Sequence, residues 1–505
     1  MKKFLRSPWY PFLFASYPVF SLLTQNITQV RETAGIRSFL VSFLGTGILF
    51  LAFRLIYRQW HRAAFVAASW VLLFFSYGQV YDVIHSFWKY PGLTPWILGI
   101  WLFLFLGVLF LASLSKIHFD SAAFTLNIIS LGLIVYPSVL LLKWSNGTGA
   151  MRVNVPSGPD PVLLAAPGEI LPDIYYLMPE DYGRADVLKK MDQIDDSQFM
   201  QYLKDTGFYV AECSQSNYDT SELSIGSSLN MDYLQNLGPG FTAASVDQGP
   251  IWNAIRYNAV SSDLKNAGYT TVAFATGFSW SELDNADVYI SPPLLWSALT
   301  AFETLLLRTT PLRHLDDLNI LNFNELDGDR YRERTLLDFN SADTLAKMPG
   351  PKFVFMQIIA PHPPFVFDPN GAKTDPSSFL NEENIYTEDK YTQGFRNEVP
   401  FVNQEIEDTI TTLIEKSARP LVIVLQTDTG PWLTSGPDTF KILNAYYMPG
   451  HTQKLYPSIS PVNTFRVIMD AYLGANLPLL DDISYYSPIP HIYDFSKVSN
   501  SCLGG

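Results

Sequence analysis

Four long apolar stretches constrain this 505-residue chain more than any other feature of its sequence. They cover residues 39–57, 63–84, 95–114 and 122–142. A helix needs about 20 apolar residues to cross the hydrocarbon core of a bilayer, so each stretch predicts a membrane-spanning helix. A fifth stretch, residues 9–23, is shorter and contains Pro11 and Pro18, and a cleaved signal peptide is its alternative. We favour an uncleaved anchor because no A-x-A-like cleavage site follows it, and we expect about five spans.

Charge divides the chain into two chemically different parts. Residues 1–145 contain 11 Lys and Arg against 3 Asp and Glu, whereas the remainder contains 23 against 45. The basic residues of the short loops favour a cytoplasmic N-terminus, which after five spans places everything beyond Lys143 outside the cytoplasm. We therefore expect a multi-pass protein of the cell membrane with an extracytoplasmic C-terminal domain. Membrane lipids are its expected partners, and the acidic domain argues against nucleic acid because it would repel a polyanion.

Three polar residues, Gln79, Asp82 and Asn127, lie at or near membrane depth. Such residues can mark a transport path, but contacts with a neighbouring helix are the commoner role. We therefore interpret residues 1–145 as a transmembrane anchor and keep transport as the less favoured alternative.

Cysteine usage says little about function. Cys213 and Cys502 are the two cysteines of the chain, and neither stands in a CxxC motif. This excludes a zinc ribbon and a disulfide framework. One disulfide between them is compatible with the sequence, although nothing in the sequence supports it.

The pattern changes after a linker rich in Gly and Pro at residues 146–172, and residues 173–505 form the expected outer domain. Predicted strands are 174–178, 208–211, 270–275, 353–359 and 421–426. Predicted helices are 196–204, 294–306, 405–416 and 462–472. Short apolar strands that alternate with helices predict an α/β domain with a mainly parallel sheet, in which ligands bind at the carboxyl ends of the strands.

Polar side chains follow four of these strands. They are Glu180 and Asp181, Thr220 and Ser221, His362, and Asp428. Carboxylates, hydroxyls and a histidine at one sheet edge predict a site for a hard metal ion and a phosphate. Each also has an ordinary alternative: a helix N-cap for Thr220 or Ser221, a solvated loop for Glu180 and Asp181, a turn for Asp428, and a backbone hydrogen bond for His362.

At these same segments the chain resembles the sulfatase-like, membrane-anchored branch of the alkaline phosphatase superfamily, related to lipoteichoic acid synthases and phosphoethanolamine transferases. The segments are PDIYYLMPEDYGRADVL, SNYDTSELSIGSSLN, APHPPFVFDPNG, LVIVLQTDTGP and ILNAYYMPG. The resemblance covers most of the chain and implies an alkaline-phosphatase-like outer domain. It also implies a divalent metal ion, namely manganese, zinc or magnesium.

The resemblance assigns roles to individual residues. Glu180, followed by Asp181, and Asp428 match the metal carboxylates. Ser221 matches the nucleophile, or Thr220 if the register shifts by one residue. His362 matches the histidine that contacts the substrate phosphate or protonates the leaving group.

Thr429 departs from the family pattern, because relatives have a histidine metal ligand at this position. A neutral hydroxyl is a poorer metal donor than imidazole. His451 is the candidate to compensate, or to bind substrate. Two hypotheses follow: a hydrolase or phosphotransferase acting on a lipid-linked or envelope phosphoester, or a catalytically degenerate relative that binds or scaffolds. The absence of a CxPxR motif around either cysteine argues against a formylglycine sulfatase and favours phosphate chemistry.

Overall fold

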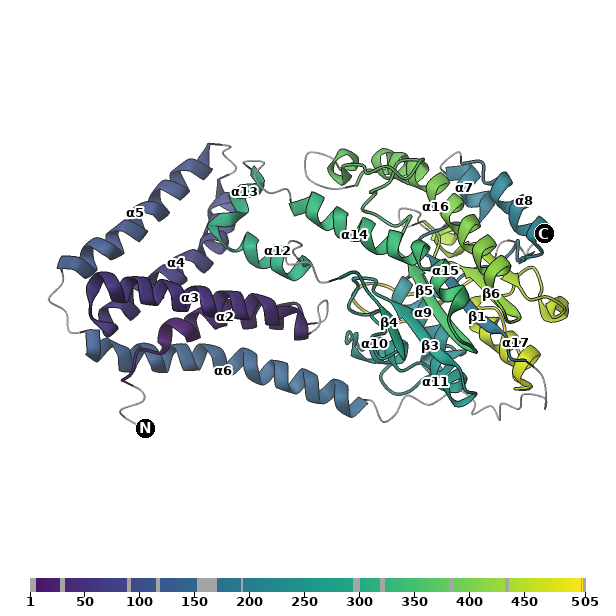
Figure 1. Cartoon of the computed structure of the whole chain (residues 1–505), viewed down its shortest axis with the longest axis horizontal. Helices are drawn as coiled ribbons and strands as arrows, with labels where there is room; N and C mark the ends of the chain where they lie inside the picture. The colour runs from purple at the N-terminus through teal and green to yellow at the C-terminus, as the bar shows by residue number, and fades with distance from the viewer. Residues whose placement is uncertain are drawn as a thin grey trace. The chain divides into compact units, whose positions relative to one another are not determined.

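The chain folds into two compact units. One contains Met1–Gly149 and Leu295–Asp327, and the other contains Ala150–Leu294 and Gly328–Gly505. The computed structural model (Figure 1) describes residues 6–27, 32–88, 92–114, 119–151, 170–191, 194–293, 300–317, 323–380, 386–431, 436–500 and 502. Most of the predicted linker at 146–172 lies outside these residues, and residues 146–151 form the end of a helix.

The first unit is a helical bundle. Its elements are α2 (Tyr10–Gln25), η1 (Glu32–Gly35), α3 (Ile36–Tyr57), α4 (Trp60–Phe87), α5 (Leu93–Leu114), α6 (Phe119–Met151), α12 (Ala301–Arg308), η3 (Pro311–Arg313) and α13 (His314–Asp317). Within the described residues, four helical segments are long and apolar enough to cross a membrane: α3, α4, α5 and Ala122–Lys143 of α6. Large apolar side chains such as Leu55 and Phe103 are 79% and 73% exposed, as expected of side chains that face lipid. The four long apolar helices predicted from sequence are confirmed.

The fifth expected span forms a shorter helix. α2 has 16 residues, which gives about 24 Å at 1.5 Å per residue. The hydrocarbon core is about 30 Å thick, so α2 is short for a complete span. Its Tyr10 and Phe14 are buried in a core shared with Phe50 of α3 and Ala64 of α4. α2 is therefore an integral part of the bundle.

A segment far along the sequence returns to this bundle. Residues 300–317, here called the return segment, contain α12, η3 and α13. Thr300 begins α12 with a capping box, in which its hydroxyl accepts from the Glu303 N–H and the Glu303 carboxylate accepts from the Thr300 N–H. Phe302 and Leu306 are buried against Val19 of α2. The sequence analysis had placed this segment in the outer domain.

Polar contacts fix the return segment on the spanning helices. The Arg37 guanidinium donates twice to the Glu303 carboxylate, and Arg313 pairs with Asp82 at 2.8 Å. The Tyr77 hydroxyl and His314 Nε2 lie 2.6 Å apart. Asp82, a transport candidate by sequence, thus has a structural partner.

Gly78 and Asn127 make further close contacts in this bundle, whereas Gln79 is exposed. The Gly78 N–H donates to the Thr309 carbonyl at 2.9 Å, and a Cβ on Gly78 would lie 2.6 Å from Thr309 Cα. Glycine is therefore required on α4 where the return segment crosses it. Asn127 Nδ2 donates to the Ser7 carbonyl at 2.7 Å, and Gln79 is exposed on α4.

The second unit is an α/β domain around a seven-stranded sheet in the order β2-β7-β6-β1-β5-β3-β4. Its strands are β1 (Asp173–Pro179), β2 (Tyr209–Val210), β3 (Thr270–Phe274), β4 (Val288–Ile290), β5 (Lys352–Ile358), β6 (Leu421–Gln426) and β7 (Asn444–Tyr447), and β8 (Ser484–Tyr486) and β9 (Ser496–Val498) form a separate pair. β7 is antiparallel to both of its neighbours, and the other pairings of this sheet are parallel. The predicted α/β class with a mainly parallel sheet is confirmed.

Helices cover both faces of this sheet. They are α7 (Ala185–Met191), α8 (Ser197–Thr206), α9 (Ser221–Asn230), η2 (Leu234–Asn236), α10 (Gly249–Arg256), α11 (Ala259–Asn266), α14 (Phe323–Asn340), α15 (Ala342–Lys347), η4 (Pro376–Phe379), α16 (Glu388–Lys416), η5 (Gly436–Phe440), η6 (Thr452–Lys454) and α17 (Pro461–Leu473). Alternate residues of β1 point to opposite faces: Tyr176 packs in a core with α9, α10, α11 and α17, and Tyr175 packs in a core with α8, α15 and α16. Burial on both faces explains why the central strands are apolar without interruption.

Candidate active site

Three carboxylates gather where the two central strands end. β1 and β6 are parallel neighbours with Leu177 opposite Leu425, so the residues that follow them emerge at one sheet edge. Glu180, Asp181 and Asp428 are 1%, 2% and 1% exposed. The Asp181 N–H donates to Asp428 Oδ1 at 3.3 Å. The alternatives of a solvated loop and an exposed turn therefore do not describe these residues.

Electrostatics in this cluster favours a bound cation. Burial raises the pKa of Glu180 well above its ordinary value, and the charges of Asp428 and Asp181 raise it further, against a hydrogen bond from Gln357. Burial also raises the pKa of Asp428, and hydrogen bonding from the Ser221 hydroxyl opposes part of that rise. Both shifts mean that negative charge is costly here without a counter-charge.

Thr220 and Ser221 stand at the start of α9. Thr220 occupies the N-cap position with an extended backbone, but its side chain makes no capping hydrogen bond to any described residue. Its hydroxyl is buried without a hydrogen-bond partner among the described residues. The N-cap alternative is therefore not supported for Thr220, and the N–H groups of the first turn of α9 are available for an anion.

His362 lies in the loop that follows β5. Its Nδ1 is 2.6 Å from the carbonyl of Pro363, and since a carbonyl can only accept, Nδ1 carries the proton. Nε2 then holds a lone pair, 4.0 Å from Asp181 Oδ2. Burial lowers the pKa of His362, so the neutral ring predominates near pH 7. The backbone hydrogen bond expected as an alternative exists, and it sets the tautomer that turns Nε2 toward the carboxylates.

Thr429 lies beside the carboxylates and contacts one of them. Its hydroxyl donates to Asp181 Oδ1 at 3.3 Å. The next residue is glycine because a Cβ on Gly430 would lie 2.8 Å from the carbonyl oxygen of Asp438. In this structure Thr429 is thus a hydrogen-bond donor to Asp181.

His451 is not brought to this site. It is exposed after β7, and its ring packs against Tyr472 at a centroid distance of 4.5 Å. β7 runs antiparallel to β6, so the residues after β7 leave the sheet at the edge opposite to Asp428. The expectation that His451 compensates for Thr429 or binds substrate depended on the fold bringing it close, and the direction of β7 instead leads it away from Asp428.

The candidate residues line one cavity of about 770 Å³. Glu180, Asp181, Thr220, Ser221, His362 and Thr429 all contribute to its wall. Sequence reasoning missed its aromatic side, which is formed by Phe278, Trp280 and Tyr486. It also missed Gln357, whose amide donates to Glu180. The sequence could have pointed to Gln357, because it is the polar residue within the apolar run FVFMQII.

The cluster offers oxygen ligands to a metal ion, but the described side chains do not complete a coordination shell. Among the described residues, no three His, Cys, Asp or Glu side chains are grouped so that they could hold an ion. Asp428 Oδ2, however, is buried and lacks a hydrogen-bond partner in the described part of the chain. Mg²⁺ commonly binds through one or two carboxylates together with substrate phosphate, and Mn²⁺ also favours oxygen ligands. The donor set fits such an oxygen-bound ion better than it fits zinc.

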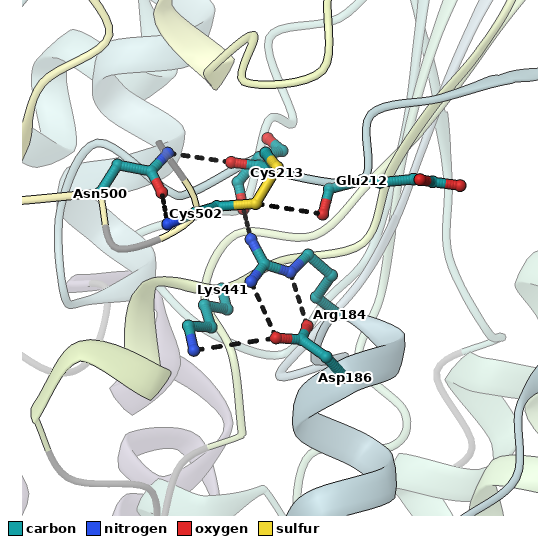
Figure 2. The surroundings of a disulfide bond; sticks show 8 residues. Arg184, Asp186, Glu212, Cys213, Lys441, Asn500 and Cys502 are labelled. Atoms are coloured by element: carbon teal, nitrogen blue, oxygen red, sulfur yellow. Dashed lines mark hydrogen bonds and ion pairs between the residues drawn. A yellow bond between two sulfur atoms is a disulfide. The ribbon is translucent and has the colours of Figure 1, made fainter. Parts of the chain in front are cut away.

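A disulfide ties the C-terminal segment to the chain that leads to Thr220 and Ser221. Figure 2 shows the bond between Cys213 and Cys502, which are 289 residues apart in sequence. Asn500 reinforces it by donating to the Cys213 carbonyl at 2.9 Å. Beside the bond, Arg184 donates to the Ser214 carbonyl at 3.3 Å and pairs with Asp186 at 2.6 Å. The one disulfide that the sequence left unsupported is present.

Comparison with known proteins returns structural matches without sequence matches. No family model matches the chain, and no curated protein matches it. The C-terminal periplasmic domain of EcEptC from Escherichia coli, in complex with Zn, has 10% identity and a TM-score of 0.43 over 68% of this chain and 96% of that one. Lipooligosaccharide phosphoethanolamine transferase A from Neisseria meningitidis has 13% identity and a TM-score of 0.40, over 92% and 94%. A protein in the alkaline phosphatase superfamily from Vibrio parahaemolyticus has 10% identity and a TM-score of 0.39, over 71% and 83%.

Proposed function

We propose that this protein is a membrane-anchored phosphotransferase or hydrolase that acts on a phosphoester outside the cytoplasm. The observation that carries the proposal is the meeting of Glu180 and Ser221 at the wall of one cavity, with Asp428 hydrogen-bonded to Ser221. Hydrogen bonding of the Ser221 hydroxyl to Asp428 lowers the pKa of that carboxyl against the effect of burial, so a nucleophile and a proton acceptor are adjacent.

The chain's own groups support a two-step transfer. Ser221 Oγ attacks phosphorus and loses its proton to Asp428, while the bond from phosphorus to the leaving oxygen breaks. The N–H groups at the start of α9 hold the phosphoryl oxygens. In the second step water or an acceptor hydroxyl attacks the phosphorus of the phosphoserine, and the bond from phosphorus to Ser221 Oγ breaks. His362 Nε2 accepts the proton of the attacking group, because Nδ1 is the protonated nitrogen, and Ser221 Oγ takes its proton back from Asp428.

A divalent ion held by Glu180 and Asp428, with Asp181 beside them, would supply Lewis-acid stabilisation of the phosphoryl charge. Mg²⁺ or Mn²⁺ suits these oxygen donors. Because two carboxylates leave much of the coordination shell to substrate and water, we expect metal affinity to rise when a phosphoester is present.

The setting suggests the substrate and the compartment. Residues 1–145 anchor the protein, and residues 173–505 face outward if the N-terminus is cytoplasmic. A disulfide persists in an oxidising compartment, which supports that orientation. An enzyme held at the membrane meets lipid-linked or envelope-polymer phosphoesters, and we propose that class of substrate.

One observation favours a second function, that of a catalytically degenerate binding or scaffold protein. Thr429 donates a hydrogen bond to Asp181 at the position where relatives have a metal-binding histidine. In this case the cavity would accept a ligand without turning it over.

The two functions are separated by metal titration of the full-length protein in detergent, using Mg²⁺ and Mn²⁺ with and without a nitrophenyl phosphodiester. The enzyme hypothesis expects metal-dependent release of nitrophenol and metal binding that Asp428→Asn weakens more than about 100-fold, beyond the effect of an outer-shell change. Asp186→Asn is the matched control because Asp186 is a carboxylate at the surface of the same domain, 53% exposed. Metal binding without turnover would favour the degenerate protein, and the absence of metal binding would refute the enzyme.

A further inference from the structure

The helical bundle contains a second cavity, of about 640 Å³, which no part of the proposed reaction uses. Its walls come from α3, α4, α5 and the return segment. Most of the lining side chains are aliphatic or aromatic, for example Trp70, Phe74 and Phe105. This volume falls within the range of about 300–1,000 Å³ that is usual for small-molecule sites.

The cavity extends along one face of α3. Ser38, Ser42, Gly45 and Leu49 line it at helical spacing, and three of these four residues are small. The stretch from Arg37 to Leu49 rises about 18 Å along the helix. One leaflet contributes about half of the roughly 30 Å hydrocarbon core, so the cavity has the length of an acyl chain in one leaflet.

The polar groups gather at one end of this face. Arg37 is the second residue of α3 and pairs with Glu303 at the cavity wall, so the two charges cancel. Ser38, which is 6% exposed and also lines the cavity, has a hydroxyl without a hydrogen-bond partner among the described residues. A buried hydroxyl without a partner is costly, so Ser38 is suited to donate to an acceptor on a bound molecule.

We propose that this cavity binds a zwitterionic glycerophospholipid of the surrounding bilayer. One acyl chain lies along α3, a glycerol ester carbonyl accepts from Ser38, and the head group lies at Arg37 and Glu303. A zwitterionic head group matches a cation and an anion that neutralise each other, whereas an anionic head group would face the Glu303 carboxylate. Because Leu306 and Thr310 also line the cavity, the lipid joins the return segment to the spanning helices.

The test fills the cavity and measures lipid binding by the full-length protein. A Cβ on Gly45 would meet no atom within 4 Å, so Gly45→Phe places its ring in the cavity without a backbone clash. Gly132 on α6 is equally open and does not line the cavity, which makes Gly132→Phe the matched control. Each delipidated protein is titrated with phosphatidylcholine and with phosphatidylglycerol in mixed micelles, and thermal stability is recorded.

We expect phosphatidylcholine to stabilise the wild type and Gly132→Phe, and to bind Gly45→Phe at least tenfold more weakly. Equal stabilisation of all three proteins, or none of the wild type, would overturn the site. Stronger binding of phosphatidylglycerol would overturn the choice of head group. Should Gly45→Phe fail to fold, Ser38→Ala serves in its place, with a several-fold loss expected because it removes the ester contact.

Discussion

The cavity of the bundle and the acidic cavity of the α/β domain handle charge in opposite ways. In the bundle, the Arg37 cation and the Glu303 anion pair directly, and the remaining wall is largely apolar. In the α/β domain, Glu180, Asp181, Asp219 and Glu222 line one cavity, and no lysine or arginine lines it within the described residues. A site in which a cation and an anion pair with each other needs no counter-ion, whereas a site lined by carboxylates favours the binding of a cation. The first arrangement suits a neutral amphiphile, and the second suits chemistry on a metal-bound phosphoester.

The largest expected effect comes from removing the nucleophile of the acidic cavity. Ser221→Ala should lower metal-dependent phosphodiester turnover by more than about 1,000-fold, because the attacking oxygen is lost. Thr220→Ala is the matched variant, since Thr220 is the neighbouring hydroxyl at the start of α9. Single-turnover rates and trapping of a phosphoprotein distinguish them. Full activity in Ser221→Ala, with loss in Thr220→Ala, would transfer the nucleophile to Thr220.

The paired charges of the bundle come next. Glu303→Gln should reduce the free energy of unfolding by about 3 kcal/mol, because it leaves the Arg37 guanidinium partly buried without its carboxylate. Arg37→Met combined with Glu303→Leu should recover most of that loss, since apolar replacements of a buried pair are often neutral. Denaturant unfolding in detergent measures both. A double variant no more stable than Glu303→Gln would show that packing, and not charge pairing, holds the return segment.

A covalent link distinguishes the α/β unit from the bundle. Cys213→Ser should cost about 2–3 kcal/mol, because the bond restricts a very long loop in the unfolded chain. We expect the lower half of the usual range because β8 and β9 hold part of the same segment without it. Thermal unfolding with and without reductant checks the value. Cys213→Ser and the double Cys213→Ser, Cys502→Ser variant should agree, and an unchanged midpoint would show that the tail contributes little.

The same two regions show how far sequence reasoning reaches. Spans and central strands were predicted because each is a continuous apolar run, buried by lipid or by helices on both faces. Glu180 and Asp428 were found because they directly follow such runs. His451 was misplaced because an apolar run does not reveal that β7 is antiparallel. The return segment was missed because its partners, such as Tyr77 for His314, lie 237 residues away in sequence.

A buried carboxylate without an ion pair among the described residues should make the α/β unit sensitive to pH. Glu398 is fully buried on α16. It accepts hydrogen bonds from the N–H groups of Val366 and Phe367, which follow His362 in the same loop. Burial raises its pKa to about 8 from an ordinary value of 4.5. Since the folded state binds the proton more tightly, the contribution of Glu398 to stability is complete below about pH 4.5 and is lost as the pH rises through 8.

Glu398→Gln keeps the shape and the accepting oxygen but cannot ionise. It should match the wild type near pH 4.5 and be more stable than the wild type at pH 9 by on the order of 4 kcal/mol, because each pKa unit between the unfolded and folded values is worth about 1.4 kcal/mol. Glu407→Gln, a more exposed change on the same helix, is the control for general charge effects. A constant difference between Glu398→Gln and wild type across this range would mean that Glu398 is ionised in the folded protein throughout. The contrast between paired and unpaired carboxylates would then be restricted to the acidic cavity.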